Sequence, residues 1–456
     1  MQITDTTVAQ IWRLPADNID LLAFHTRWPE RYPHLLQSVA QGALGRFDIL
    51  FAYPQSTQVL SHVEQGEAFI RQFEQTFARL RVQTPACDEL ADVPFYGGWM
   101  AYFSYEYAQV IEPCLNLPPT THPLAILQRF PAALIVDHHT QSLLLVAESA
   151  YIELLSQMQA DLTQVRASEL APAGAPPLTI LQRAEQDPQH YLQGVETIKD
   201  YILAGDVFQV NLSRQWQVSL SPDTDASAVY RQLRLHNPAP FACLVRFDDW
   251  AIVSSSPERL VRYRAPWVET RPIAGTRKRS ASVQQDLALI DELIAHPKER
   301  AEHIMLIDLE RNDLGRICQP GSVEVNELMV VESYEHVHHI VSNVRGRLQA
   351  GLTPLQVIHA LFPGGTITGC PKIRCMQIIA ELEQGAREAY TGSVGYINLD
   401  GSMDFNILIR SFVQTGSTLS FRAGAGIVAD SQAPAELEET RHKARGLLRA
   451  LGEIGT

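Results

Sequence analysis

Short apolar runs separated by turn residues recur through the first 165 residues of the chain. Such runs are typical of strands that are buried on at least one face. Gly97 and Gly98 come just before an aromatic run that we interpret as core packing. The strands expected in this region are Ile49–Tyr53, Trp99–Phe103, Ala132–Asp137 and Leu143–Ala147.

Helical periodicity becomes frequent after Pro188. Leu192, Val195, Ile198 and Ile202 repeat at helical spacing and predict a helix that ends before Gly205. Further helices are expected over residues 284–316 with a break at Pro297, over 354–362, from Pro371 onward, and over 434–454. Strands are expected over residues 208–212, 242–247, 251–255, 338–344, 393–399 and 405–413.

The order of these elements predicts the fold class and the domain organisation. Many strands without regular alternation with helices favour an α+β fold of large antiparallel sheets over a doubly wound one. The segment SELAPAGAPP, rich in Pro, Ala and Gly, has no periodicity and is the best linker candidate. We therefore expect an N-terminal region over residues 1–165, a linker over 166–187 and a second region over 188–456.

Composition excludes several classes of protein. The 456 residues are 46% hydrophobic, and the formal charge is −14, which disfavours nucleic acid or an anionic membrane as the partner. No apolar stretch approaches the roughly 18 residues of a membrane helix. The six cysteines form no CxxC pair, so we expect reduced thiols in a cytoplasmic protein.

Two pairs of glutamates have the spacing of a metal site. Glu299 and Glu302 lie three residues apart, as do Glu436 and Glu439, so each pair shares one face of its helix. Mg²⁺ takes carboxylate oxygens and keeps water or substrate as its other ligands. The same spacing also occurs on helices whose faces are simply solvated.

Other candidate groups are weaker when taken singly. The segment FPGGTITGCPK (362–372) lacks the Lys-Ser/Thr ending of a phosphate loop, but it is a glycine-rich turn before a helix, which suits an anion. His336, His338 and His339 alternate across a strand, so a three-histidine metal site is not expected, although one of them can act as an acid or base. Glu258 follows a strand and is a candidate general acid.

Together, these segments resemble the chorismate-utilising enzyme family. The matching segments keep the family's order and span most of residues 190–450. They are GDVFQVNLS (205–213), SSSPERL (254–260), ETRPIAGTR (269–277), KERAEHIMLIDLERNDLGR (298–316), YEHVHHIVS (334–342), FPGGTITGCPK (362–372), GSVGY (392–396), ILIR (407–410), AGAGIVADS (423–431) and ELEETRHKA (436–444).

The resemblance implies a two-lobed α+β fold in which chorismate and Mg²⁺ bind between packed antiparallel sheets. It implies that Glu302 and Glu439 ligate Mg²⁺, and that Glu299 and Glu436 hold the waters of the metal. A metal and a few cations are also what a dianionic substrate needs in an acidic protein.

The resemblance also assigns groups to the substrate. Glu258 is implied as the acid that protonates the departing 4-hydroxyl, and His339 matches a histidine beside the reacting ring. The residues implied to hold the carboxylates and the enolpyruvyl arm of chorismate are Thr366, Tyr396, Arg410, Gly424, Gly426 and Lys443.

The residue at position 209 separates branches of the family. Members that form isochorismate or salicylate carry a lysine that activates water, whereas this chain has Gln209. Glutamine is a poor general base, which favours ammonia as the nucleophile. No cysteine lies in a GxCxG elbow, so we expect a separate glutamine amidotransferase chain to supply the ammonia.

Two ammonia-using branches then remain open. Ala274 stands where most aminodeoxychorismate-forming members have a lysine that attacks chorismate, and where anthranilate-forming members have alanine. Asn211, Phe241 and the absence of an LLES-type element for tryptophan binding favour the aminodeoxychorismate branch, in which a subclass carries alanine. In that subclass ammonia replaces the lysine. The alternatives are anthranilate formation and a non-catalytic chorismate-binding subunit.

Overall fold

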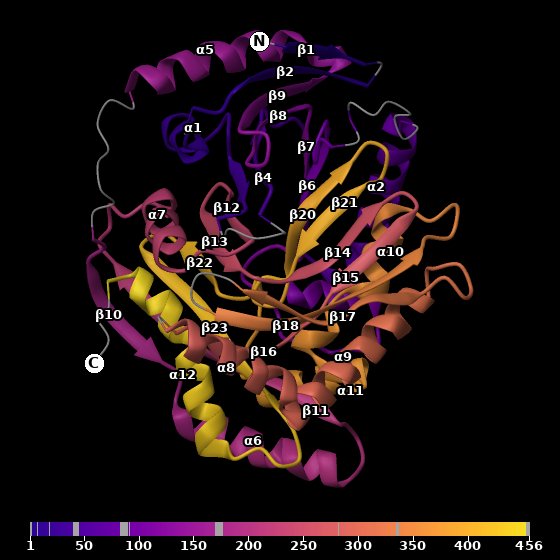
Figure 1. Cartoon of the computed structure of the whole chain (residues 1–456), viewed down its shortest axis with the longest axis vertical. Coiled ribbons are helices and arrows are strands. Elements are labelled where there is room, and N and C mark those ends of the chain that lie inside the picture. Colours follow the sequence, from indigo (N-terminus) through magenta and orange to yellow (C-terminus); the bar gives the residue numbers. More distant parts are fainter. Residues whose placement is uncertain are drawn as a thin grey trace.

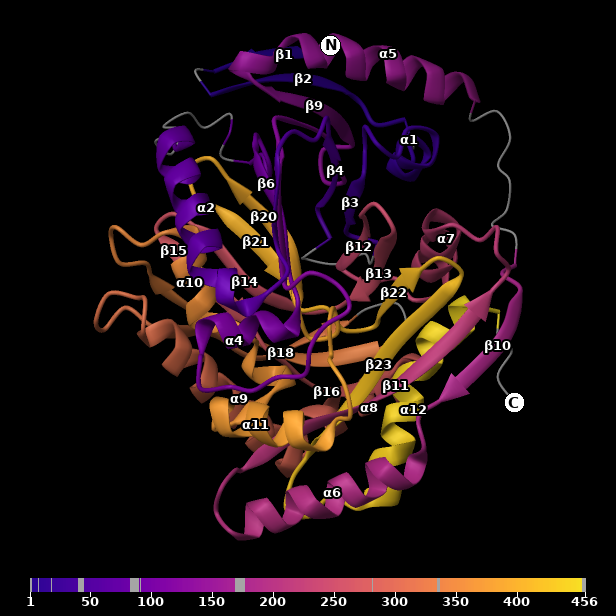
Figure 2. The same cartoon turned by 180° about the vertical axis from the view of Figure 1, so that it is seen from behind.

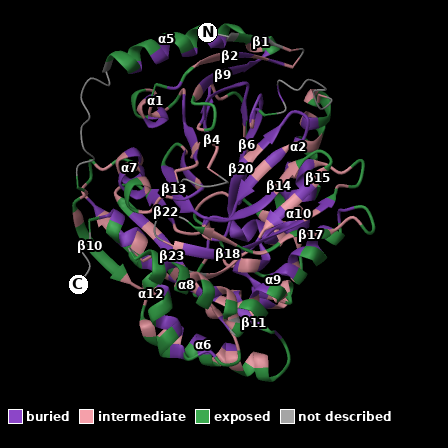
Figure 3. Cartoon of the chain, in the orientation of Figure 1, coloured by how far each residue is buried: buried purple, intermediate pink, exposed green. Residues whose placement is uncertain are grey.

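The computed structural model describes residues 2–6, 8–17, 19–39, 45–82, 90, 92–168, 177–280, 282–333 and 337–452. Its strands form two antiparallel sheets, with helices on the outer surfaces (Figure 1). The interior of both sheets is buried, and most helices expose one face (Figure 3). The expected α+β fold of packed antiparallel sheets is confirmed.

The first sheet runs from the N-terminal lobe to the C-terminal part of the chain. Its strands lie in the order β1 (Gln2–Asp5), β2 (Ala9–Pro15), β9 (Ser142–Glu148), β8 (Ala132–Asp137), β4 (Phe47–Ala52), β3 (His34–Gln37), β12 (Phe241–Arg246), β13 (Trp250–Ser256), β22 (Ser411–Thr415), β23 (Thr418–Ile427), β11 (Gln209–Leu220) and β10 (Ile180–Glu185). The two-residue strand β19 (Gly369–Cys370) also pairs with β11.

The second sheet likewise combines early and late segments. Its order is β16 (Ile273–Lys278), β18 (Val337–Arg347), β15 (Trp267–Arg271), β14 (Arg259–Arg264), β21 (Met403–Asn406), β20 (Ser393–Asn398), β6 (Gly98–Phe103), β7 (Ala125–Phe130) and β5 (Thr57–Leu60). β17 (Glu324–Ser333) pairs with β18.

The described helices pack mainly against these sheets. Where they are amphipathic, their apolar faces contact the strands and their polar faces meet water. In the N-terminal lobe they are α1 (Leu21–Arg27), α2 (Gly66–Leu80), α4 (Ala108–Ile111) and α5 (Glu153–Ser168). The later ones are α6 (Pro188–Leu203), α7 (Ala226–His236), α8 (Val283–Ala295), α9 (Pro297–Gly315), α10 (Pro354–Leu361), α11 (Lys372–Leu382) and α12 (Ala433–Ala450).

Both sheets take strands from each side of the expected linker. In the first sheet β3 pairs with β12, and in the second β6 pairs with β20 (Figure 2). The range 166–187 contains the end of α5 and the whole of β10, which pairs with β11. Residues 169–176, the centre of the expected linker, lie outside the described residues.

One expected strand is divided in two. Residues 405–413 were expected to form one strand, but β21 ends at Asn406 and β22 begins at Ser411. Between them Arg410 adopts a positive φ of 52°, which a continuous strand does not allow. The break moves the chain from the second sheet to the first and places Arg410 where the two sheets meet.

Candidate active site

Two glycines, Gly424 and Gly426, leave one side of β23 without side chains of its own over these positions. Gly426 pairs with Asn211 and Gly424 pairs with Ser213 on β11, so both glycines point to the same side of the sheet. A Cβ atom on Gly424 would lie 2.6 Å from the Leu212 carbonyl, and one on Gly426 would collide with the side-chain amide of Gln209. The backbone of β23 is therefore closely approached on this side by the Leu212 carbonyl, Tyr390 and Gln209, and any side chain at either glycine would collide with these neighbours.

Glu258 supplies a buried carboxyl at the end of β13. Its side chain is 5% exposed. Burial raises the pKa of Glu258 to about 7. Four nearby groups oppose this rise: the Thr366 hydroxyl, the Ile273 N–H, Arg410 and Lys443. Burial therefore favours the protonated form of Glu258 over that of an exposed glutamate, so this carboxyl can act as a proton donor.

Three buried polar atoms in this region have unused hydrogen-bonding capacity. Among the described residues, Oε1 of Glu258, Oγ1 of Thr366 and Oε1 of Gln209 have no well-aligned partner, although the Thr366 hydroxyl lies close enough to act on the Glu258 carboxyl. The Asn211 side chain fixes the turn that carries Thr366, because its amide donates to the Thr366 carbonyl at 2.9 Å. Buried polar groups are normally paired, so this cluster is a site built for a polar ligand.

Arg410 provides a cation beside Glu258. Burial lowers the pKa of the Arg410 guanidinium, and Glu258 acts in the opposite direction. An arginine remains protonated under such a shift, so it presents a fixed positive charge to an anion. The backbone is also fixed, since the Arg410 carbonyl accepts a hydrogen bond from the Ser255 N–H at 3.1 Å.

Lys443 supplies a second cation from α12. Its ammonium donates to the Gly424 carbonyl at 3.0 Å and pairs with Glu439 at 2.8 Å, one helical turn away. Side chains of Lys443 and Glu439 are 47% and 48% exposed. The site is therefore open to solvent on the α12 side.

His339 and Ala274 occupy the neighbouring strands β18 and β16. His339 is buried, and burial lowers its pKa to about 4, which keeps the imidazole neutral at pH 7. Its Nδ1 lies 3.3 Å from the Gly275 carbonyl, next to Ala274. His338 points elsewhere, to Asp286 at 2.9 Å, and His336 lies outside the described residues.

The four glutamates of the expected metal site lie on α9 and α12. Glu299 pairs with Arg277 at 3.3 Å, Glu302 is half-buried on the same helix, and Glu436 is buried on α12 beside the exposed Glu439. Within the described ranges, no three His, Cys, Asp or Glu side chains cluster closely enough to hold a metal ion. The donors are all carboxylates, which suits Mg²⁺ with water and substrate as its remaining ligands.

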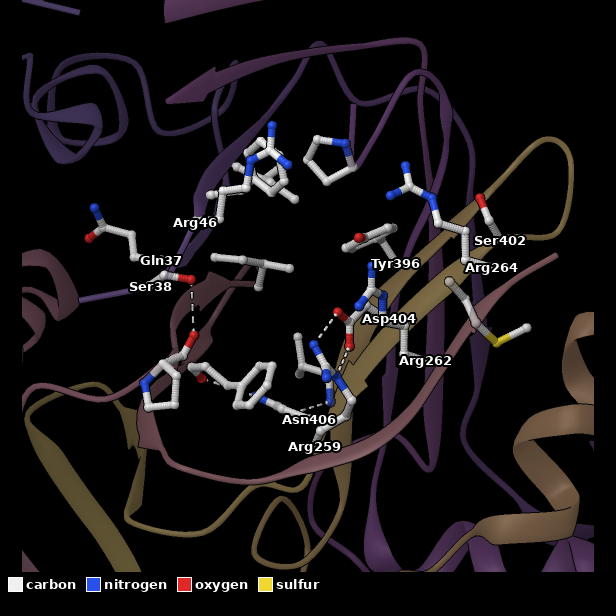
Figure 4. Close-up of a pocket in the computed structure, with 18 of the residues that line it drawn as sticks. Gln37, Ser38, Arg46, Arg259, Arg262, Arg264, Tyr396, Ser402, Asp404 and Asn406 are labelled. Atoms are coloured by element: carbon white, nitrogen blue, oxygen red, sulfur yellow. Dashed lines mark hydrogen bonds and ion pairs between the residues drawn. The ribbon is translucent and has the colours of Figure 1, made fainter. Parts of the chain in front are cut away.

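Tyr396 is a sequence candidate that the structure does not place with the others. It lines a cavity of about 350 Å³ between the two lobes, where Arg259, Arg262 and Arg264 also lie (Figure 4). Its ring contacts Phe95, and across the strand pair it faces Asp404. Strand alternation on β20 directs its side chain to the side of the sheet that lines this cavity.

The same cavity corrects one expectation about the N-terminal region. We expected no LLES-type element, but Leu35–Ser38 reads LLQS, and Gln37 and Ser38 line this cavity together with Phe241. Gln37 stands where the motif has glutamate. A variant of the element is therefore present.

Two groups near the site were missed in the sequence. The hydroxyl of Tyr390 lies 3.0 Å from the Cβ position of Gly424, and only the segment YTGSVGY signalled it, because a tyrosine stands at each end. Glu310 is buried close to Glu258, and burial together with Asp313 raises its pKa to about 8. In the sequence, Glu310 is indistinguishable from an exposed helical glutamate.

In the described helices, no segment combines the length and apolar character that a bilayer crossing requires.

Comparison with known proteins places these residues in a family. Residues 36–449 match the family model of chorismate binding enzymes. An anthranilate synthase component I-like protein of Synechocystis is 43% identical over 79% of this chain and 73% of its own length. Aminodeoxychorismate synthase component 1 of Bacillus subtilis is 40% identical over 92% of both chains. The crystal structure of anthranilate synthase component I from Streptococcus pneumoniae aligns with a TM-score of 0.75 and 30% identity, covering 89% of this chain and 93% of that one.

Proposed function

The chain belongs to the chorismate-binding enzyme family, and we propose that within this family it is an aminodeoxychorismate synthase component I. It would convert chorismate and ammonia to 4-amino-4-deoxychorismate, with the ammonia supplied by a glutamine amidotransferase partner. The observation that carries the proposal is the Asn211 side chain, whose amide donates to the Thr366 carbonyl at 2.9 Å and so fixes the turn beside the buried Glu258.

Loss of the 4-hydroxyl of chorismate requires a proton. Hydroxide is a poor leaving group, so the carboxyl of Glu258 donates its proton and water departs. Arg410 and Lys443 provide positive charge for the substrate carboxylates, and Lys443 is held in place by the Gly424 carbonyl, to which its ammonium donates. Thr366 adds a hydroxyl with a buried oxygen beside the Glu258 carboxyl.

Ammonia is the nucleophile that the site can accept. Gln209 is neutral and cannot remove a proton from water, and Ala274 offers no amine for covalent attack. We propose that ammonia adds at C2 as water leaves C4, which gives 2-amino-2-deoxyisochorismate without a covalent link to the protein. A second ammonia then adds at C4, and the C2 amine, still protonated, leaves as ammonia. The neutral His339 would lie beside the ring during both steps.

Mg²⁺ is proposed as the cofactor. Glu302 and Glu439 would be its direct ligands, and Glu299 and Glu436 would hold its waters, since each pair lies on one helix at i and i+3. When bound, the ion supplies positive charge against a substrate carboxylate. The protein side chains still provide the acid and the space for ammonia.

The choice of product rests on particular positions. The B. subtilis aminodeoxychorismate synthase aligns over 92% of both chains, which supports this branch. Asn211 holds the turn of Thr366 through its side chain, so it shapes the substrate site directly. The second candidate is anthranilate synthase component I, which Ala274 and the LLQS cavity favour.

One assay separates the two products. The purified chain is incubated with chorismate, Mg²⁺ and concentrated ammonium at alkaline pH, and the products are separated by mass and fluorescence. We expect a species that aminodeoxychorismate lyase converts to 4-aminobenzoate. Direct release of fluorescent anthranilate would instead establish the second candidate.

A further inference from the structure

The buried side chain of Arg387 uses all five of its N–H donors. Two of them bind the carboxylate of Glu383, at 2.6 and 2.9 Å, and one lies 3.4 Å from the Thr391 hydroxyl. The remaining two donate to the carbonyls of Asn211, at 2.7 Å, and Ile367, at 3.1 Å. Arg387 is 4% exposed, so water cannot readily replace these partners.

The two backbone carbonyls hold the turn that carries Thr366. Ile367 follows Thr366 in the chain, and the Asn211 side chain donates to the Thr366 carbonyl at 2.9 Å. One guanidinium therefore joins the strand β11 to this turn. The Thr366 hydroxyl acts on the carboxyl of Glu258, so the position of the turn determines how well that contact is made.

The N-terminal lobe holds Arg387 in turn. The carboxylate of Glu106, which is 2% exposed, accepts hydrogen bonds from the Arg387 N–H at 2.6 Å and the Glu388 N–H at 3.0 Å. The Tyr105 N–H donates to the Glu388 carbonyl at 2.8 Å. The Arg387 guanidinium also lies over the ring of Tyr105, 4.8 Å from its centroid. Residues of the first lobe thus fix both the backbone and the side chain of Arg387.

We propose that Arg387 is a positioning residue of the acid site: it holds the turn of Thr366 against Glu258, and Glu106 of the N-terminal lobe holds Arg387. Arg387 acts through the turn and needs no contact with the reacting atoms. The inference rests on the proposed function, because it gives Arg387 a role through the acid that this function requires.

Arg422 is a matched residue that lacks these contacts with the turn. It binds the same carboxylate of Glu383, at 2.9 Å, and is 5% exposed. Its guanidinium also donates to the Ser213 hydroxyl at 2.9 Å. Among the hydrogen bonds of the described residues, Arg422 donates to neither the Asn211 nor the Ile367 carbonyl. Arg422 therefore reports on the ion pair alone.

The contact between Thr366 and Glu258 sets the direction of the expected pH effect. Burial raises the pKa of Glu258, and the Thr366 hydroxyl opposes this rise by stabilising the anion. A looser turn weakens that opposition, so the pKa rises further. Since the protonated form is the active acid, the loss of rate at alkaline pH should then begin at a higher pH.

The other charged groups that act on Glu258 stay the same in the single variants. They are Arg410, Lys443 and the buried Glu310.

The test compares Arg387→Lys with Arg422→Lys. Either lysine keeps a positive charge beside Glu383, but at position 387 an ammonium cannot reproduce the planar fork that reaches both carbonyls and the carboxylate. Each variant is assayed with chorismate, Mg²⁺ and ammonium over a range of pH, at a constant concentration of free ammonia. Urea midpoints report how far each substitution disturbs the fold. Glu106→Gln is the second variant, because it keeps one oxygen acceptor for the two N–H groups and loses the other.

We expect Arg387→Lys to lower kcat by about tenfold or more and to move the alkaline limb of kcat/KM upward by about half a pH unit or more. Glu106→Gln should move the limb in the same direction by a smaller amount. Arg422→Lys should lower the urea midpoint about as much as Arg387→Lys, while kcat stays within about twofold and the limb does not move.

A double variant tests whether Arg387 acts through Thr366. Thr366→Val removes the hydroxyl and should move the alkaline limb upward by itself, so Arg387→Lys should add no further shift to it. The positioning role is overturned by a further shift in the double variant, by an unmoved limb in both Arg387→Lys and Glu106→Gln, or by an equal shift in Arg422→Lys. If the unmodified chain does not aminate chorismate with ammonium, the proposed function fails instead.

Discussion

The hydroxyl of Tyr390 lies 3.0 Å from the position that a Cβ atom would take on Gly424. Tyr390 belongs to the loop between α11 and β20, and Gly424 to β23, so the contact joins the loop that leads into the second sheet with a strand of the first. Tyr390 also lines a cavity of about 350 Å³ together with Gln215, Gln217 and Arg422. A single side chain thus contacts both the glycine positions of β23 and this cavity.

The two glycines of β23 should differ in their tolerance of alanine. A Cβ on Gly424 would lie 2.6 Å from the Leu212 carbonyl, which belongs to the backbone, whereas on Gly426 the neighbour is the flexible side chain of Gln209. We expect Gly424→Ala to lower the free energy of unfolding by about 1 to 3 kcal/mol, as overpacking does. Gly426→Ala should fold and raise KM for chorismate. Urea denaturation and steady-state kinetics measure both effects.

A double variant provides the control for Gly426. Gln209→Ala removes the side chain with which the new methyl group collides, so Gln209→Ala/Gly426→Ala should regain the stability of Gln209→Ala alone. If Gly424→Ala is as stable as the parent protein, the close approach to the Leu212 carbonyl does not constrain this strand.

Glu258→Gln should abolish turnover and change the pH dependence of stability. We expect kcat to fall by about 100- to 10,000-fold, because glutamine cannot donate a proton to the leaving group. The pKa of Glu258 is raised to about 7 in the folded chain, from an ordinary value of 4.5. The folded state therefore holds this proton more tightly, and its stabilising effect is full below pH 4.5 and lost as pH rises through 7.

Glutamine does not ionise, so the variant avoids the loss of stability above pH 4.5. Relative to the parent protein, Glu258→Gln should gain up to about 3 kcal/mol between pH 4.5 and pH 8. Urea titrations at several pH values measure this difference. A constant difference across that range would show that Glu258 ionises as easily in the folded chain as in the unfolded one.

The buried ion pairs of Glu383 should be sensitive to removal of their anion. Its two oxygens accept hydrogen bonds from Arg387, Arg422 and the Ser213 N–H. Glu383→Gln would leave two buried guanidinium groups without their counter-charge, and we expect a loss of about 3 to 5 kcal/mol of unfolding free energy. Glu381→Gln, on the exposed face of the same helix, is the control and should change stability by less than about 0.5 kcal/mol.

The proposed metal ligands can be tested without relying on turnover. Glu302→Gln and Glu439→Gln should each weaken Mg²⁺ binding by about tenfold or more, measured by calorimetry in the presence of chorismate. Glu438→Gln is the matched control, because it is an exposed carboxylate one residue away on α12. Equal Mg²⁺ affinity in all three variants would remove Glu302 and Glu439 from the metal site.

The alanine at position 274 should prevent covalent chemistry. Ala274 lies on β16 opposite Ile340 and has no nucleophile to offer. We expect intact-protein mass spectra of samples quenched during turnover to show only the mass of the unmodified chain. A stable chorismate adduct would contradict the proposed sequence of ammonia additions.

Local sequence patterns were sufficient for most individual elements. Apolar periodicity predicted α6 and the break at Pro297 between α8 and α9, because helix-forming and helix-ending signals are local. The division of residues 405–413 was not predictable in this way. Its cause is the crossing between two sheets, and the apolar pattern continues through it without a turn signal.

Family motifs supplied the list of candidate residues but not their arrangement. Glu258 and Thr366 are about one hundred residues apart in the sequence, and only the packing of two sheets brings them together. The motif GSVGY pointed to Tyr396, whereas the structure puts Tyr396 at the arginine-lined cavity and Tyr390 beside Gly424. Two tyrosines six residues apart are equivalent in a motif, and the turn between them decides which one reaches the site.

The sequence by itself determined the fold class, the membership of a chorismate-binding family and the absence of a lysine at positions 209 and 274. These are properties of residue types and their order along the chain. Tertiary structure alone decided the burial that raises the pKa of Glu258 and lowers that of His339, and the position of the cavity that Tyr390 lines. Each of these depends on which distant groups exclude water from a side chain or pair with it, and that information is not local.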